Sequence, residues 1–180
     1  MKYRIKIFGI IVGFILISFI VFRLFFMGYY YDFLEYWTLS DKIIWSSDEK
    51  LTWNDFYENG DGLYAKVGLS ARYNVNDPIL FRSKTVFIPE ESYVSDTTDM
   101  INLRIAQAKF DLLEIYRRKM VKEVDSLRKI NNNNKRTSYF KKMNQRYYDL
   151  FKLEWEKVFK EESEIESLEK LEKRIREVLN

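Results

Sequence analysis

The 180-residue sequence contains no histidine and no cysteine, and only two prolines and six glycines. Without cysteine the chain can form no disulfide framework, perform no thiolate chemistry and carry no lipoprotein-type lipid anchor. Without histidine it has no imidazole with which to bind a metal ion. These two absences restrict the chemistry that any site in the protein can perform.

Apolar residues nevertheless make up 47% of the chain, and aromatic residues make up 17%. This content is sufficient for a packed core, and the length fits one domain plus a short additional segment. We therefore expect a folded protein rather than a disordered one.

The charge of the chain is unevenly distributed. Four of its 30 basic residues, namely Lys2, Arg4, Lys6 and Arg23, lie in residues 1–27, which contain no acid. The rest of the chain has 26 cations against 27 anions, so the sequence pI of about 8.8 reflects the N-terminal segment. We expect no nucleic-acid partner, because the remainder has no excess of positive charge.

An apolar run of 16 uncharged residues, Ile7–Phe22, lies between Lys6 and Arg23. A helix rises about 1.5 Å per residue, and the hydrocarbon core of a bilayer is about 30 Å thick. The run alone is short, but residues 5–27 are long enough if Lys6 and Arg23 extend their charged ends toward the interfaces. We therefore predict a transmembrane anchor within residues 1–27, with the lipid bilayer as its partner through residues 5–27.

A cleaved signal peptide is the competing interpretation, and it would make the protein secreted. Such a peptide needs small residues at a cleavage site, whereas this run continues into Arg-Leu-Phe-Phe-Met-Gly-Tyr-Tyr-Tyr. Basic residues precede the run, and Asp32, Glu35 and Asp41 follow it, so the positive-inside rule predicts a cytoplasmic N-terminus. The rest of this single-pass protein would then lie outside the cytoplasm, on the periplasmic side of the cell membrane.

Residues 28–41 form a juxtamembrane segment rich in aromatic side chains. Such side chains suit the interface between bilayer and water, and packing on the folded domain is the alternative. The aromatic residues concerned are Tyr29, Tyr30, Tyr31, Tyr36 and Trp37.

Residues 42–130 have the patterns of an α+β domain. Lys42–Trp45 is a short apolar strand candidate, and residues 63–75 alternate between apolar and polar side chains, which predicts a half-buried strand. Residues 76–78 predict a turn, and a second strand through residues 79–88 ends before a proline. We expect the two longer strands to pair as a small antiparallel hairpin.

The apolar spacing becomes helical after Asp99, which is placed to cap a long helix that runs to about Ile130 and packs on the hairpin. Residues 131–180 then predict one long charged helix, over most of 138–180, with Glu and Lys or Arg pairs at i,i+4. A short apolar seam on this helix predicts packing on its own domain, and a coiled-coil partner is the alternative. The seam consists of Leu168, Leu171, Ile175 and Val178.

Motifs for catalysis give no specific signal. Ser-x-x-Lys occurs four times in this lysine-rich sequence, without a Lys-Thr-Gly or Ser-Asp-Asn companion. Residues 55–66 match a calcium loop only in part, because Tyr57 and Lys66 occupy ligand positions. The motifs identify no catalytic residue and no acid–base pair, and we expect no cofactor.

Three segments carry a more specific pattern. Residues 51–56 read Leu-Thr-Trp-Asn-Asp-Phe and include Trp53, Asp55 and Phe56, while residues 89–94 read Pro-Glu-Glu-Ser-Tyr-Val. The third segment, residues 103–119, includes Gln107, Phe110, Asp111, Glu114, Ile115, Tyr116, Arg118 and Lys119.

In this order, the three segments resemble a bacterial family of predicted secreted zinc-dependent proteases, a domain of otherwise unknown function. The family's segments read Leu-Thr-Trp-x-Asp-Phe, then Pro-x-x-Ser-Trp-Val, then roughly His-Glu-Gln-x-His-Phe-Asp-Ile-Ala-Glu-Ile-Tyr-Ala-Arg-Lys. The resemblance covers about residues 43–120.

The resemblance implies a zinc site that this chain lacks. In His-Glu-x-x-His the two histidines bind zinc, and the glutamate polarises the attacking water. The aligned residues here are Ile105, Ala106 and Lys109, so both ligands and the base are replaced, and the lysine would repel a cation. We expect no zinc centre of this kind, and we expect Ile105 and Lys109 on one helix face against the hairpin.

These features predict a membrane-anchored, catalytically inactive relative of the protease-like family. Its function would be that of a binding or scaffold protein of the envelope, with a protein or peptide partner. One alternative is a hydrolase with a rebuilt non-histidine site that uses acids such as Asp111 or Glu114. The other is a structural envelope protein that assembles through its C-terminal helix.

Overall fold

The protein has an α+β fold that divides into two compact units, Met1–Asp41 and Lys42–Asn180. The computed structural model describes residues 2–57, 60–73, 80–129, 137–158 and 163–179, without the side chains of residues 2–10, 23–25, 27 and 137. The predicted class, helices with a small antiparallel sheet, is confirmed.

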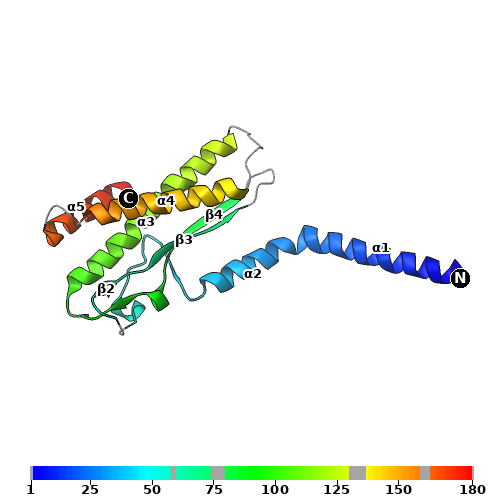
Figure 1. Ribbon diagram of the computed structural model, residues 1–180, viewed down its shortest axis with the longest axis horizontal. Helices are drawn as coiled ribbons and strands as arrows, with labels where there is room; N and C mark the ends of the chain where they lie inside the picture. Colours follow the sequence, from blue (N-terminus) through cyan, green and yellow to red (C-terminus); the bar gives the residue numbers. More distant parts are fainter. Residues whose placement is uncertain (1, 58–59, 74–79, 130–136, 159–162, 180) are drawn as a thin grey trace. The chain divides into compact units, whose positions relative to one another are not determined.

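The first unit consists of two successive helices, α1 (Lys2–Phe25) and α2 (Met27–Leu39) (Figure 1). The amide of Phe26 donates to the carbonyl of Phe22 at 2.8 Å, and the amide of Tyr30 donates to the carbonyl of Phe26 at 2.9 Å. Helical hydrogen bonding therefore continues through the junction, as expected for a segment without proline. Within the described part of the chain, no helix has both the length and the apolar character needed to cross a membrane.

The second unit contains a three-stranded antiparallel sheet in the order β1 (Ile43–Ile44), β4 (Phe81–Phe87), β3 (Val67–Tyr73). The pairing of β3 with β4 confirms the predicted hairpin, and β1 confirms the short strand predicted at Lys42–Trp45. The turn predicted at residues 76–78 lies outside the described residues.

The prediction of one continuous strand over residues 63–75 is wrong. The chain leaves the extended ladder at Ala65 and Lys66, and β2 (Leu63–Tyr64) pairs instead with β5 (Tyr93–Val94) in a second antiparallel sheet. At the break, the amide of Lys66 donates to Ser92 Oγ at 2.9 Å. Side-chain alternation persists across the break because Ala65 and Val67 are both buried, so alternation alone could not reveal the change of partner.

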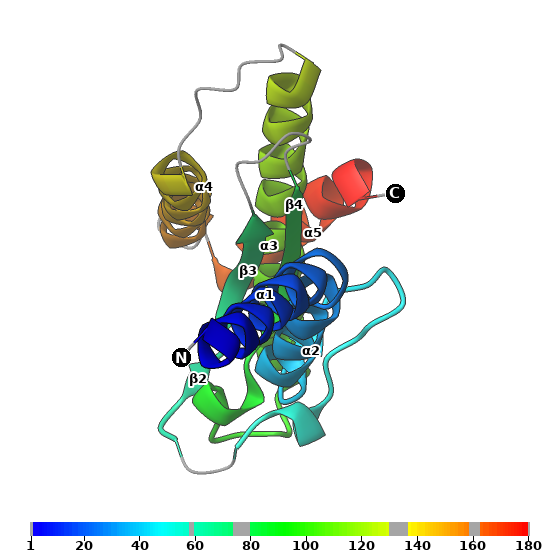
Figure 2. The same cartoon turned by 90° about the vertical axis from the view of Figure 1, so that its right-hand side faces the viewer.

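Helix α3 (Met100–Lys129) matches the predicted long helix in position and length. Asp99 caps it as expected, with Oδ1 accepting the amide hydrogen of Ile101 at 2.9 Å. The helix packs along β3 and β4 and also contacts both C-terminal helices, so it is the central element of this unit (Figures 1 and 2).

The C-terminal region contains two helices, α4 (Thr137–Val158) and α5 (Glu164–Leu179), and the prediction of a single helix over most of 138–180 is wrong. Ser163 is not helical. Its Oγ accepts the amide hydrogen of Glu166 at 3.4 Å, and its carbonyl accepts that of Ser167 at 3.0 Å. A serine that precedes a glutamate by three residues is a helix-start signal, and it outweighs the continuous charged pattern.

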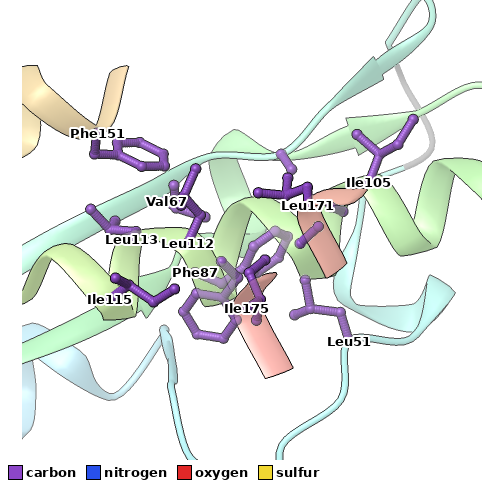
Figure 3. Close-up of a cluster of buried hydrophobic side chains, with 14 of the residues drawn as sticks. Leu51, Val67, Phe87, Ile105, Leu112, Leu113, Ile115, Phe151, Leu171 and Ile175 are labelled. Carbon is purple, nitrogen blue, oxygen red and sulfur yellow. The ribbon is translucent and has the colours of Figure 1, made fainter. Parts of the chain in front are cut away.

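The main core joins α3, the two long strands, α4 and α5 (Figure 3). Phe87, Phe110 and Leu113 are completely buried at its centre. The seam of α5 packs here through Leu168, Leu171 and Ile175, which confirms the predicted packing on its own domain. Val178 is the exception, since it is 49% exposed.

Candidate functional site

Residues 105, 106 and 109, where the resemblance places two zinc ligands and a base, lie on α3. Ile105 is 8% exposed and Ala106 is completely buried, and both belong to the main core. Figure 3 shows Ile105 among the core side chains. Lys109 is half-buried. Two of the three residues are thus part of the hydrophobic core.

The Lys109 ammonium is held by groups from three parts of the unit. Its Nζ donates to the carbonyl of Ala65, between β2 and β3, at 2.8 Å. The same nitrogen lies 5.4 Å from the ring centroid of Tyr64 in β2 and 5.6 Å from that of Trp155 in α4. Both rings are within the range of a cation–π interaction. The predicted packing of the helix on the hairpin is confirmed for α3 as a whole, and Lys109 contacts the chain just before β3.

The electrostatic environment of Lys109 disfavours its charged form. Burial lowers the pKa of Lys109, and the nearby positive charge of Lys66 lowers it further. Lys66 itself forms an ion pair with Glu91 at 2.8 Å, and the hydrogen bond to Glu91 is the main cause of its raised pKa. Among the described residues, no carboxylate forms an ion pair with Lys109.

Gln107 and Asp111 bind residues at the start of the Leu51–Phe56 segment and just before it. The Gln107 Oε1 accepts the amide hydrogen of Leu51 at 2.9 Å, and its Nε2 donates to Asp111 Oδ1 at 3.0 Å. The indole of Trp45 donates to the same Asp111 oxygen at 2.7 Å. Gln107 and Asp111 therefore fix Trp45 and Leu51 to α3.

The first motif forms a compact turn of its own. Trp53–Asp55 is a short 3-10 helix, and Asp55 Oδ2 accepts the amide hydrogen of Thr52 at 2.6 Å. Phe56 is buried, and its ring centroid lies 5.1 Å from that of Phe87. Trp53, Asp55 and Phe56 thus stabilise this turn and its packing on the sheet.

Glu114 is the most buried charged group among the described residues, at 1% exposure. Its carboxylate accepts hydrogen bonds from Arg117 Nε at 2.7 Å, Arg118 Nε at 3.1 Å and Thr85 Oγ1 at 2.9 Å. Arg118 also donates to the carbonyl of Leu179 at 3.2 Å. The cluster joins α3 to β4 and to the end of α5.

Tyr116 joins α3 to the two C-terminal helices. Its hydroxyl donates to Glu154 of α4, which also pairs with Arg174 of α5. Burial raises the pKa of Tyr116, and the hydrogen bond to Glu154 and its negative charge raise it further.

In the described part of the chain, no group of three or more Asp or Glu residues is placed to hold a metal ion. Sequence reasoning missed Tyr64, Lys66 and Trp155 as neighbours of Lys109. Tyr64 and Lys66 have no motif of their own, and Trp155 lies on a helix whose packing partner could not be read from its sequence.

Comparisons of the chain with models of protein families, with curated proteins and with solved structures gave no match.

Proposed function

We propose that the protein is a membrane-anchored binding protein, a catalytically inactive relative of the protease-like family. Its second unit would hold a protein or peptide partner outside the cytoplasm.

The observation that carries this proposal is the position of Lys109. A fixed ammonium stands where the resemblance places a zinc ligand, bonded to the Ala65 carbonyl and flanked by Tyr64 and Trp155. A cation at this point opposes metal binding. Without a metal ion for catalysis, the second unit is left with a binding role.

A hydrolase with a rebuilt site would need free carboxylates near Lys109. Asp111 accepts hydrogen bonds from Trp45 and Gln107, and Glu114 is buried between two arginines and Thr85. A general acid or base must exchange a proton with substrate or water. Because both carboxylates have structural partners, the binding role has the stronger support.

The membrane anchor is supported by the surface of α1. Every residue from Ile11 to Phe22 is exposed except Gly13, and most of them are large and apolar. An exposed apolar surface of this size is typical of contact with lipid or with another protein. The apolar run in the sequence, Ile7–Phe22, extends beyond these described side chains.

Peptide cleavage tests the proposal against the hydrolase alternative. The full chain, purified in detergent, is incubated with a mixed peptide library, with and without added zinc, and products are identified by mass spectrometry. We expect no cleavage above that of a buffer control. Cleavage that disappears in the Asp111→Asn variant would overturn the proposal in favour of a rebuilt site.

A further inference from the structure

Two lysines and two aromatic rings meet at the junction of β2 and β3. Lys109 comes from α3 and Lys66 from the junction itself, while Tyr64 and Trp155 flank the Lys109 ammonium. Burial is the main cause of the lowered pKa of Lys109, and the positive charge of Lys66 lowers it further. Only Lys66 has a carboxylate partner among the described residues, and that partner is Glu91.

We propose that Lys109, Lys66, Tyr64 and Trp155 form a binding site for a carboxylate group of a peptide ligand. This inference depends on the proposed binding function and names the chemistry of the ligand.

The charges of the site favour an anion over any other ligand. Lys109 carries three donors, of which the Ala65 carbonyl uses one. An anion placed between the two lysines would relieve their repulsion, and a charge-assisted hydrogen bond is about twice as strong as a neutral one. Because Lys109 is half-buried, such a bond forms in partly dehydrated surroundings, where it is strengthened.

The aromatic walls favour an organic carboxylate over an inorganic anion. Tyr64 is 40% exposed and stacks on Tyr93, with their ring centroids 5.4 Å apart. Together these rings offer an apolar surface beside the ammonium. A side chain or backbone next to a carboxylate can pack on such a surface, whereas phosphate or sulfate cannot.

Glu91 is the natural competitor of the ligand. It pairs with Lys66 at 2.8 Å, and its side chain is 55% exposed, so an incoming carboxylate must share Lys66 with it. Removal of the Glu91 charge should therefore strengthen binding, while removal of either lysine charge should weaken it. These opposite changes in affinity distinguish a binding site from a general loss of stability, which would weaken binding in every variant.

The test uses the full chain in a non-ionic detergent, with isotope-labelled lysine followed by NMR. The Lys109 signal is assigned by its loss in Lys109→Met, and its pKa is measured with acetate, with a short peptide that has a free C-terminal carboxylate, and with the same peptide amidated. We expect acetate and the acid peptide to raise the pKa of Lys109, and the amidated peptide to leave it unchanged.

The affinity of variants for the acid peptide completes the test. Lys66→Gln should weaken binding of the acid peptide about tenfold, as loss of one charge-assisted hydrogen bond predicts. Glu91→Gln should tighten binding, Lys109→Arg should retain it, and the exposed control Lys141→Gln should have no effect.

The inference would be overturned if the amidated peptide shifted the pKa of Lys109 as much as the acid peptide does, or if only inorganic phosphate shifted it. It would also be overturned if the pKa of Lys109 shifted no more than that of the exposed Lys141. The proposed binding function would survive that result if the chain still cleaved no peptide. Cleavage of the library would instead overturn the proposed function itself, so the two failures are distinguishable.

Discussion

Several α3 residues that match the motif of the resembled family contact other parts of the fold. Glu114 reaches β4 and the end of α5, Tyr116 reaches α4, and Gln107 reaches the backbone of Leu51. If the resemblance is correct, these residues keep structural roles that do not depend on a metal ion. Lys109 differs from them, because it places a positive charge where the resemblance expects a metal ligand.

Substitution of Glu114 tests the strongest of these contacts. Glu114→Gln preserves shape but removes the charge that two arginines share. We expect a loss of about 3 kcal/mol in the free energy of unfolding, because breaking a buried ion pair leaves its partners uncompensated. Urea denaturation of the full chain in detergent measures this loss.

The matched control for Glu114 is Glu90→Gln. Glu90 is exposed, so its substitution should change the free energy of unfolding by less than about 0.5 kcal/mol. Equal effects of the two substitutions would contradict the structural role of Glu114.

Tyr116 predicts a pH dependence of stability with a definite sign. Because the pKa of Tyr116 is raised in the folded state, its contribution is complete below its unfolded pKa of about 10 and is lost as the pH rises further. The free energy of unfolding should therefore fall less between pH 9 and pH 11 in Tyr116→Phe than in the natural chain. Lys109 and the other tyrosines are common to both proteins, so their titration cancels in this difference; identical pH profiles would contradict the prediction.

At the scale of elements, α5 belongs to the domain core. Leu168 is completely buried in the main core, while Val178 at the end of the same helix is 49% exposed. The ion pair between Arg104 and Glu172 adds a further contact from α3. A helix fixed in this way contributes to the stability of the whole unit.

Truncation of Leu168 should destabilise the second unit as a whole. We expect Leu168→Ala to lower the free energy of unfolding by about 2–5 kcal/mol, as for other buried leucines, and Val178→Ala to lower it by less than about 0.5 kcal/mol. Tryptophan fluorescence during urea unfolding gives both values. A separate early transition in Leu168→Ala, with the main midpoint unchanged, would show that α5 unfolds independently.

Most elements that depend on local signals were predicted from the sequence, with the start of α5 as the exception, and those that depend on distant partners were not. The hairpin follows from alternation, and α3 follows from its helical period and the Asp99 cap. The exchange of partner at Ala65 depends on Ser92 and could not be seen locally. The start of α5 was missed although Ser163 and Glu166 carry a local signal.

The residues of the candidate site were likewise predicted only in part. Its three α3 positions follow from the resemblance, because they lie at fixed spacing within one helix. The groups that surround Lys109 belong to β2, α4 and the β2–β3 junction, and the Ala65 carbonyl is 44 residues away in sequence. No periodicity within one segment specifies such a contact.

At the scale of the whole molecule, we propose that an N-terminal anchor holds the second unit at the outer face of the membrane. The chain has no cysteine, so one introduced cysteine gives a label without background. Ser126→Cys marks the second unit at an exposed position, and Tyr3→Cys marks the N-terminus. We expect a membrane-impermeant maleimide to label Ser126→Cys in intact cells and Tyr3→Cys only after lysis.

The anchor itself is tested by a charge within α1. Leu16→Arg should reduce the membrane-bound fraction, because an arginine at the centre of a spanning helix costs about 2.5–3.5 kcal/mol on the insertion scale, whereas Leu16→Phe should leave it unchanged. Protection of Ser126→Cys in intact cells, or equal membrane fractions for both Leu16 variants, would contradict the anchored arrangement.

The central claim is that Lys109 stands where the resemblance places a zinc ligand and that the protein binds no zinc. Its most direct test is equilibrium dialysis of the full chain in detergent against zinc, followed by elemental analysis. The account predicts well below one zinc ion per chain, with no difference between the natural chain and Lys109→Met. One tightly held zinc ion per chain would contradict it.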